Sequence, residues 1–199
     1  MAYQDKEIVL ISGANTGLGL EIARQLLRDH GDRFYCLIGC RTLSKGEAAV
    51  KELNDQGLTG CEVLKIQVTD DESIARAAKV VEEKFGKLDV LHVNVRNIDP
   101  QFCLNAHIQQ AGIAPDKDML PAKEPISKLI METMATNVAG AAQTAETFVP
   151  LLSKADNPRI VFMSTGFGSL QRVSTFQSNE KWPAYSGKSV AHVLHRGPH

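Results

Sequence analysis

Three glycines at a fixed spacing are the residues of this chain best suited to hold a charged ligand. Gly13, Gly17 and Gly19 follow the apolar stretch 7–11 and lead into a helical apolar pattern over residues 20–27. Glycine lets the backbone turn sharply and lets a ligand come close. The start of the following helix points free N–H groups and a positive dipole end at an anion. The order of strand, glycines and helix therefore predicts a phosphate-binding loop.

The elements that position this loop alternate between short apolar strands and amphipathic helices. We expect strands over residues 7–11, 34–40, 61–68, 88–93 and 159–163, and helices over 20–27, 45–53, 71–85 and 127–152. Ser44 and Asp70 are the predicted N-caps of two of these helices. The alternation predicts an α/β fold, namely a doubly wound parallel sheet with helices on both faces.

Polar residues follow the predicted strands at their carboxyl ends. Beyond the glycine-rich loop, these are Arg41, Gln67, Asn94 and Ser164. In a doubly wound sheet the ligand binds beyond the carboxyl ends of the strands, where the two halves of the sheet meet. We therefore expect these side chains to contribute to one site.

The composition favours one globular domain over residues 1–199. A net charge of −1, from 22 basic and 23 acidic residues, gives no electrostatic reason to expect nucleic acid or an anionic membrane as a partner. No apolar run approaches the length of a transmembrane helix, and the first residues lack the core of a signal peptide. Cys36, Cys40, Cys61 and Cys103 form no CxxC pair. Cys36 and Cys40 share a predicted strand, so we expect them to pack as reduced thiols in a cytoplasmic protein, with disulfide or metal roles as the less favoured alternative.

The spacing Gly13-x-x-x-Gly17-x-Gly19 resembles the TGxxxGxG signature of the short-chain dehydrogenase/reductases, with Ser12 in the place of the threonine. It differs from the GxGxxG fingerprint of other dinucleotide-binding folds. The resemblance extends from residue 7 to about residue 190 and implies a Rossmann-type fold. It also implies cofactor contacts from the loop residues Ser12, Gly13, Asn15, Thr16, Gly17, Leu18 and Gly19.

Further positions belong to the cofactor site that this resemblance implies. Arg41 stands where dinucleotide-binding folds place the group that meets the adenosine ribose. A guanidinium pairs with a 2′-phosphate, and the end of this strand holds no acid to accept from a free 2′-hydroxyl. NADP(H) is therefore preferred over NAD(H). Gln67 and Val68 resemble the stretch beside the adenine, with Gln67 in the usual place of an aspartate, and Asn94 matches the first residue of the Asn-Asn-Ala-Gly motif.

The family's catalytic pair, Tyr-x-x-x-Lys, has an altered counterpart in this chain. Lys188 follows Tyr185 at a spacing of three residues, and Ser189 occupies the expected lysine position. One residue on a helix rotates a side chain by about 100°, although neighbours three apart can still meet. In the family, the ammonium lowers the pKa of the phenol and holds the nicotinamide ribose.

The resemblance supplies three other candidates for proton transfer. Asn137 resembles the asparagine that bends the long helix and holds a water in the proton relay. Thr165 occupies the position of the catalytic serine, and Ser164 is the alternative. A structural Asn137, with a backbone hydrogen bond inside a helix, is the competing interpretation.

Residues 95–110 interrupt the Asn-Asn-Ala-Gly motif, which resumes at Ala111. We hypothesise a retained intron, because removing most of this segment restores the family's spacing. The alternative is a surface loop that serves as a lid, although a loop of this length is unusual in a compact domain. Residues 190–199 form an atypical tail in place of the family's last strands. We expect the histidines of this tail, His192 and His195, to form no metal site.

The resemblance implies a carbonyl-reductase-like oxidoreductase that transfers a hydride between NADP(H) and a ketone, aldehyde or alcohol. Tyr185 would protonate the carbonyl oxygen, Lys188 would tune the phenol, and Thr165 or Ser164 would steady the developing alkoxide. The alternatives are a nucleotide-binding protein with impaired catalysis, and a chain whose uncovered sheet edge prevents stable folding. A homo-oligomer is compatible with the sequence, with its usual interface incomplete.

Overall fold

The computed structural model describes residue 3, residues 5–94 and residues 131–163. The chain divides into two compact units, the first Met1–Asn94 with Ala142–Met163 and the second Val95–Ala141 with Ser164–His199. Several sequence predictions fall outside the described residues: the insertion at 95–110, Cys103, Ser164, Thr165, Tyr185, Lys188 and the tail at 190–199 with its histidines.

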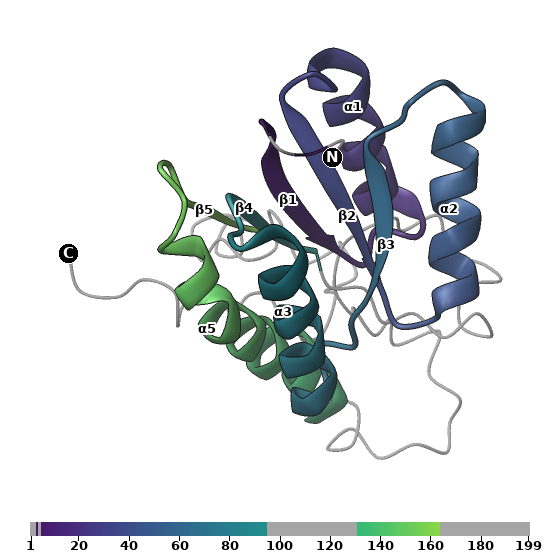
Figure 1. Cartoon of the computed structure of the whole chain (residues 1–199). Helices are drawn as coiled ribbons and strands as arrows, with labels where there is room; N and C mark the ends of the chain where they lie inside the picture. Colours follow the sequence, from purple (N-terminus) through teal and green to yellow (C-terminus); the bar gives the residue numbers. More distant parts are fainter. Residues whose placement is uncertain (1–2, 4, 95–130, 164–199) are drawn as a thin grey trace, which may run out of the picture. The chain divides into compact units, whose positions relative to one another are not determined.

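Five parallel strands form the sheet of the first unit (Figure 1). They are β1 (Glu7–Ser12), β2 (Phe34–Cys40), β3 (Cys61–Lys65), β4 (Val90–Val93) and β5 (Arg159–Phe162). Their order is β3-β2-β1-β4-β5, so the central strand β1 pairs with both β2 and β4. The chain thus winds outward in one direction and then in the other from β1, which confirms the predicted doubly wound sheet.

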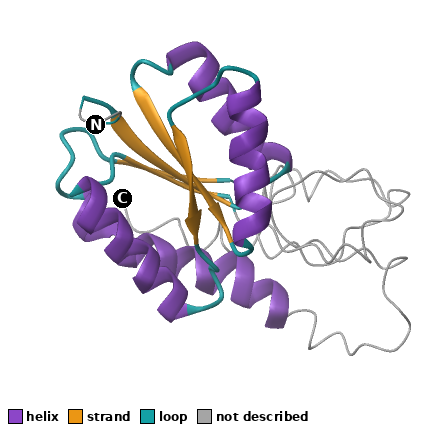
Figure 2. Cartoon of the chain, turned by 45° about the vertical axis from the view of Figure 1, so that its right-hand side comes forward, coloured by secondary structure: helices purple, strands orange, loops and turns teal. Residues whose placement is uncertain are grey.

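Helices cover both faces of this sheet, as predicted (Figure 2). The helices α1 (Gly17–His30) and α2 (Leu43–Asp55) lie on one face, and α3 (Asp71–Phe85) and α5 (Ala141–Leu152) lie on the other. The predicted cap of α3 is confirmed, because the Asp70 carboxylate accepts a hydrogen bond from the Ser73 N–H at 3.1 Å. Each helix buries small or apolar residues toward the sheet and turns its charged side chains to solvent.

The strands are apolar on both faces because both faces are covered. All seven residues of β2 are buried, and so are the last five of β1. The thiols of Cys36, Cys40 and Cys61 are free and buried, which agrees with the prediction for Cys36 and Cys40. Loss of solvent raises the pKa of Cys36 to about 12 and that of Cys61 to about 11, so neither carries charge in the folded protein near neutral pH.

Some elements are shorter than the sequence predicts. The strand β3 ends at Lys65 instead of residue 68, because the N–H of Gln67 turns to the Ser73 hydroxyl at 3.0 Å. The strand β4 begins at Val90 instead of residue 88. In the second unit, residues 131–134 are α-helical, and the predicted long helix is interrupted by the π-helical turn η2 (Ala135–Gly140).

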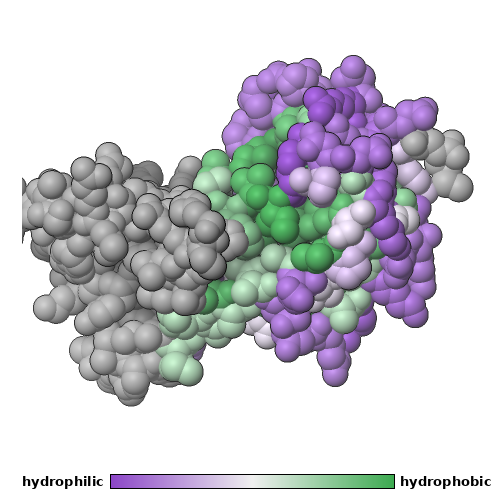
Figure 3. Space-filling model, turned by 90° about the vertical axis from the view of Figure 1, so that its left-hand side faces the viewer, coloured by the Kyte–Doolittle hydropathy of each residue, from purple (hydrophilic) through white to green (hydrophobic). Residues whose placement is uncertain are grey.

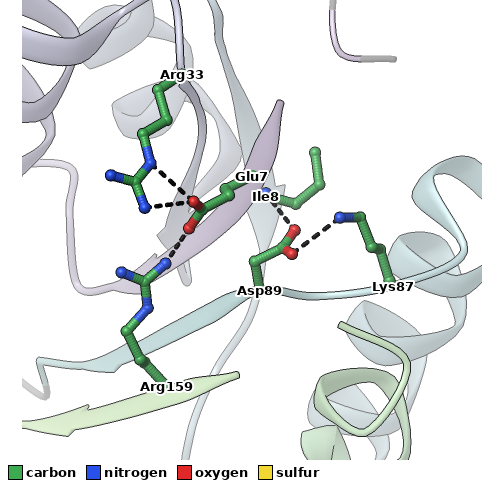
Figure 4. A network of polar contacts seen from close by, with 6 residues as sticks. All are labelled: Glu7, Ile8, Arg33, Lys87, Asp89 and Arg159. Atoms are coloured by element: carbon green, nitrogen blue, oxygen red, sulfur yellow. Dashed lines mark hydrogen bonds and ion pairs between the residues drawn. The ribbon is translucent and has the colours of Figure 1, made fainter. Parts of the chain in front are cut away.

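Charged side chains hold the amino ends of the strands together (Figure 4). Glu7 of β1 pairs with Arg33 at 2.6 Å and with Arg159 of β5. Asp89, which precedes β4 and is only 3% exposed, accepts a hydrogen bond from the Ile8 N–H at 2.8 Å. Each interaction joins segments that lie far apart in the sequence.

Exposed apolar side chains occur on and beside β5. Ile160 and Val161 are 40% and 41% exposed, and Val149 of α5 is 42% exposed. Figure 3 faces the side of the first unit that carries β5, and apolar residues gather there. Within residues 5–94 and 131–163, the helices lack the combination of length and apolar character needed to cross a bilayer.

Candidate functional site

The glycine-rich loop joins the end of β1 to the start of α1, as the sequence predicts. Gly13 and Gly17 have φ of 63° and 60°, a left-handed conformation that glycine adopts without steric cost. The Ala14 N–H donates to the carbonyl of Gly39 in β2 at 3.0 Å, which anchors the loop on the neighbouring strand. Thr16 precedes α1 without a side-chain cap, and no acid lies in the first turn. The first N–H groups of α1 are therefore suited to an anion.

The loop leaves no room for a side chain at Gly19. A Cβ atom there would lie 2.6 Å from the Asn94 side-chain nitrogen, 2.8 Å from the Gly13 carbonyl oxygen and 2.9 Å from the Ala14 Cα. Two of these atoms belong to the backbone, which cannot rotate away. The third glycine of the motif thus allows α1 to start directly against the loop and β4.

Asn94 connects the end of β4 to the glycine-rich loop. Its backbone N–H donates to the Ser12 hydroxyl at 2.9 Å, and its side-chain Nδ2 donates to the Gly13 carbonyl at 3.5 Å. Asn94 is 2% exposed, and its Oδ1 has no hydrogen-bond partner among the described residues. A buried acceptor without a donor lowers the stability of the folded protein by about 1–3 kcal/mol. A ligand with an N–H or O–H group would supply that donor.

Arg41 follows β2 directly and is exposed. The sequence prediction that Ser44 caps the next helix is wrong, because α2 begins earlier and Thr42 is its N-cap. The Thr42 carbonyl accepts the N–H groups of Lys45 and Gly46 at 3.1 and 3.2 Å, and the Thr42 side chain makes no capping hydrogen bond. Lys45 is exposed in the same first turn and was not predicted. Lys45 follows Arg41 by four residues, and residues four apart lie on the same side of a helix. That spacing is the sequence signal that would have identified Lys45.

Gln67 and Val68 lie in the turn between β3 and α3. Gln67 is exposed, and its side-chain Nε2 donates to the Thr69 hydroxyl at 3.3 Å. With Nε2 held in this way, the amide oxygen of Gln67 is the atom left to accept from a ligand.

The parallel sheet places these groups along one edge. Gln67 follows β3, Arg41 follows β2, the glycine-rich loop follows β1 and Asn94 follows β4, which is the order of these strands across the sheet. The glycine-rich loop and Asn94 meet between β1 and β4, where the winding of the sheet reverses. Ligands bind at this point in doubly wound folds. The predicted cofactor residues that the structure describes thus follow four neighbouring strands at one edge of the sheet.

Asn137 belongs to the second unit. It is 5% exposed and lies inside the π-helical turn Ala135–Gly140. Single π-turns within helices are frequently found at functional sites. Both the bend of the helix at Asn137 and the role of this residue in proton transfer stay predictions.

Comparisons with known proteins agree with this arrangement. The family model described as short chain dehydrogenase matches residues 7–187. The short-chain dehydrogenase/reductase ATR10 of Stachybotrys chlorohalonatus is 46% identical over 187 residues, which are 94% of this chain and 62% of that protein. The chain belongs to the short-chain dehydrogenase family. It spans about 60% of the length of the first curated relatives it matches.

Two solved structures illustrate the shared fold. Salutaridine reductase from Papaver somniferum is 27% identical with a TM-score of 0.63, covering 83% of this chain and 60% of its own. An NADPH-bound carbonyl reductase from chicken fatty liver is 22% identical with a TM-score of 0.70, covering 95% of this chain and 71% of its own. The second likeness concerns the fold alone.

Proposed function

We propose that this chain binds NADP(H) at the carboxyl edge of its sheet and transfers a hydride between nicotinamide and a ketone, aldehyde or alcohol. The observation that carries this proposal is the combination of a formed glycine-rich loop with Arg41 at the end of β2. An acid at the end of that strand would favour NAD(H), and the Cys40–Arg41 pair contains none.

The residues present fit a dinucleotide. The N–H groups of the loop and of the first turn of α1 would hold the diphosphate. Arg41 and Lys45, which follows it by four residues, would hold the 2′-phosphate through charge-assisted hydrogen bonds. The Gln67 amide oxygen would accept from the adenine amino group, and the buried Asn94 Oδ1 would gain a donor from the bound molecule.

NADPH supplies the hydride when it is bound, and residues of the chain transfer the proton. Tyr185 would donate its phenolic proton to the carbonyl oxygen of the substrate, and the Lys188 ammonium would lower the pKa of that phenol. The Thr165 or Ser164 hydroxyl would donate a hydrogen bond to the developing alkoxide. Asn137 would hold a water that returns a proton to Tyr185.

The names of the relatives support this chemistry. The proteins similar to this chain include a (+)-neomenthol dehydrogenase of Arabidopsis thaliana, 32% identical, and salutaridine reductase. We extend hydride transfer between carbonyl and alcohol groups to this chain by analogy. Buried free thiols also fit a reducing compartment, which supports the proposed cytoplasmic location.

The test is a comparison of NADPH and NADH binding by the chain and by Arg41→Ala. A ligand bound only by the folded state raises the melting temperature, so both cofactors can be titrated without turnover. We expect the chain to prefer NADPH, and Arg41→Ala to weaken NADPH binding about tenfold while leaving NADH unchanged. Arg28→Ala, an exposed arginine in the last turn of α1, is the matched control. Equal affinities in the unsubstituted chain would contradict the NADP(H) preference.

Activity is tested separately, by NADPH oxidation with a panel of ketones and aldehydes. Turnover that is lost in Tyr185→Phe supports the reductase. The non-catalytic alternative rests on the spacing of Lys188, which is three residues after Tyr185 where the family has four. NADPH binding without any turnover would favour that alternative.

A further inference from the structure

Gly46 lies at a contact that no side chain would fit. It is buried in the first half of α2, facing β2 and β3. A Cβ atom at this position would lie 2.5 Å from the Cys40 sulfur and closer still to the Cγ2 atom of Val63. The lack of a side chain therefore lets α2 start directly on the two strands.

The Cys40 thiol connects this contact to the turn that carries Arg41. Cys40 is 3% exposed, and its sulfur donates to the Thr42 carbonyl at 3.3 Å. The same carbonyl accepts the N–H groups of Lys45 and Gly46. We name residues 40–46 the 40–46 turn. Three of its groups donate to the Thr42 carbonyl, and the side chains of Arg41 and Lys45 are exposed to solvent.

We propose that Gly46 is a positioning residue for cofactor specificity. Because it has no side chain, the start of α2 packs closely on β2 and β3, and this close packing holds Arg41 and Lys45 where both reach a 2′-phosphate. This inference rests on the proposed NADP(H) preference. It adds a residue that does not touch the cofactor and acts through the packing of α2.

The neighbours of Gly46 cannot easily give way. Val63 is β-branched, so its χ1 angle has few alternatives. The Cys40 sulfur is held by the Thr42 carbonyl and surrounded by the core. An added Cβ would therefore move the start of α2 away from the sheet.

The displacement would stay at the start of α2. Ala49 and Leu53, further along the helix, are 3% and 0% exposed and fasten it to the sheet. Glu52 pairs with Arg24 of α1, which adds a second attachment at this end of the helix. The glycine-rich loop is held by Ser12 and Asn94 through separate contacts. The predicted effect is thus confined to the 2′-phosphate and spares the rest of the nucleotide.

The experiment compares 2′,5′-ADP with 5′-AMP, a pair of probes that differ only by the 2′-phosphate. Calorimetric titration of the full chain should show tighter binding of 2′,5′-ADP. In Gly46→Ala this preference should fall about tenfold, the loss of about one charge-assisted hydrogen bond, with 5′-AMP affinity unchanged. Gly57→Ala is the control, because Gly57 follows α2 with φ of 77° and has nothing within 4 Å of an added Cβ. It strains the other end of the same helix and should leave the preference intact.

Rescue makes the result specific to packing. Val63→Ala removes the closer of the two crowding groups, so the Gly46→Ala/Val63→Ala double variant should regain part of the lost preference relative to Val63→Ala alone. The same pair of variants serves as the test if Gly46→Ala alone does not fold.

The outcomes separate the two proposals. If the unsubstituted chain binds both probes equally, the NADP(H) preference is wrong and this inference falls with it. If the chain prefers 2′,5′-ADP but Gly46→Ala keeps the full preference, or loses affinity for both probes equally, only the positioning role of Gly46 is overturned.

Discussion

The two ends of the sheet use polar groups in opposite ways. At the amino end, Glu7 and Asp89 are matched with basic side chains and a backbone N–H across β1, β4 and β5. At the carboxyl end, glycines form the loop after β1, and the Asn94 Oδ1 is buried without a hydrogen-bond partner among the described residues. The contacts at the amino end therefore stabilise the fold, and the carboxyl end carries the hydrogen-bonding groups that we propose for the cofactor. Substitutions at the two ends should change different quantities.

The largest expected effect is at the amino end, for Asp89→Ala. The substitution leaves the buried N–H of Ile8 without its acceptor and removes the partner that Lys87 contacts at 2.9 Å. The free energy of unfolding should fall by about 3 kcal/mol, measured by urea denaturation. NADPH affinity of the folded protein should change by less than about twofold, since distant sites act independently.

Asp89→Asn is the matched control for this prediction. It keeps an acceptor for the Ile8 N–H and removes only the negative charge, so it should recover part of the lost stability. A large loss of NADPH affinity in either variant, with the protein still folded, would contradict the separation of the two ends.

The next effect belongs to the carboxyl end, for Gly19→Ala. The added Cβ meets the Gly13 carbonyl and the Ala14 Cα, so the glycine-rich loop must shift. NADPH binding should weaken by about 2 kcal/mol, roughly thirtyfold, as measured by thermal shift or calorimetry. Gly57→Ala, with open space around its added methyl group, should leave NADPH binding unchanged. Unaltered binding in Gly19→Ala would show that the loop does not contact the cofactor.

A pH titration tests the core toward the amino end, where Cys36 of β2 is paired in register with Cys61 of β3. Burial raises the pKa of both thiols from 9.0, to about 12 and about 11. Their contribution is complete well below pH 9 and is lost as pH rises through 9 toward these values, because the unfolded chain releases its thiol protons first. Unfolding free energy should fall by about 1 kcal/mol per thiol between pH 8 and pH 10.

Cys36→Ala checks the origin of this pH dependence. It lowers stability at every pH by creating a small cavity, but it should make the decline between pH 8 and pH 10 less steep. An identical slope in the variant would assign the decline to other groups.

The smallest effect concerns a carboxyl-end residue with a structural role, Asp70. Its carboxylate accepts from the Ser73 N–H at the start of α3, so Asp70→Ala should cost about 1 kcal/mol of stability. Asp70→Asn retains the cap and should cost less. NADPH affinity should be unchanged in both, in contrast to Gly19→Ala. A parallel loss of affinity would extend the binding site to this turn.

Local patterns in the sequence predicted most of the fold and the positions of the described candidate residues at the strand ends. The glycine spacing after an apolar strand located the loop, and the alternation of strands and helices placed Arg41, Gln67 and Asn94 at strand ends. Asp70 was identified because a cap acts on an N–H only three residues away. Each of these signals lies within a few neighbouring residues.

The features that were missed depend on contacts between distant residues or on backbone geometry. Nothing near Asp89 in the sequence indicates that its carboxylate reaches Ile8, 81 residues away. The crowding around Gly46 depends on how α2 packs on β3. Ser44 has the right residue type for a cap, but the backbone of Thr42 closes the turn first. Such features need the packed structure.

The central position of β1 has a consequence for how the protein is made. This strand is translated before the other four described strands, and Asn94, whose N–H donates to Ser12 just beyond β4, follows 82 residues later. At a translation rate of about 5–20 residues per second, about 4–16 s pass between the synthesis of Ser12 and that of Asn94. The strand β2 covers one edge of β1 early, while the other edge stays open beside the apolar stretch from Ile8 to Ile11. Until β4 is translated, the growing chain therefore exposes an unpaired apolar strand edge, which favours pairing with other chains.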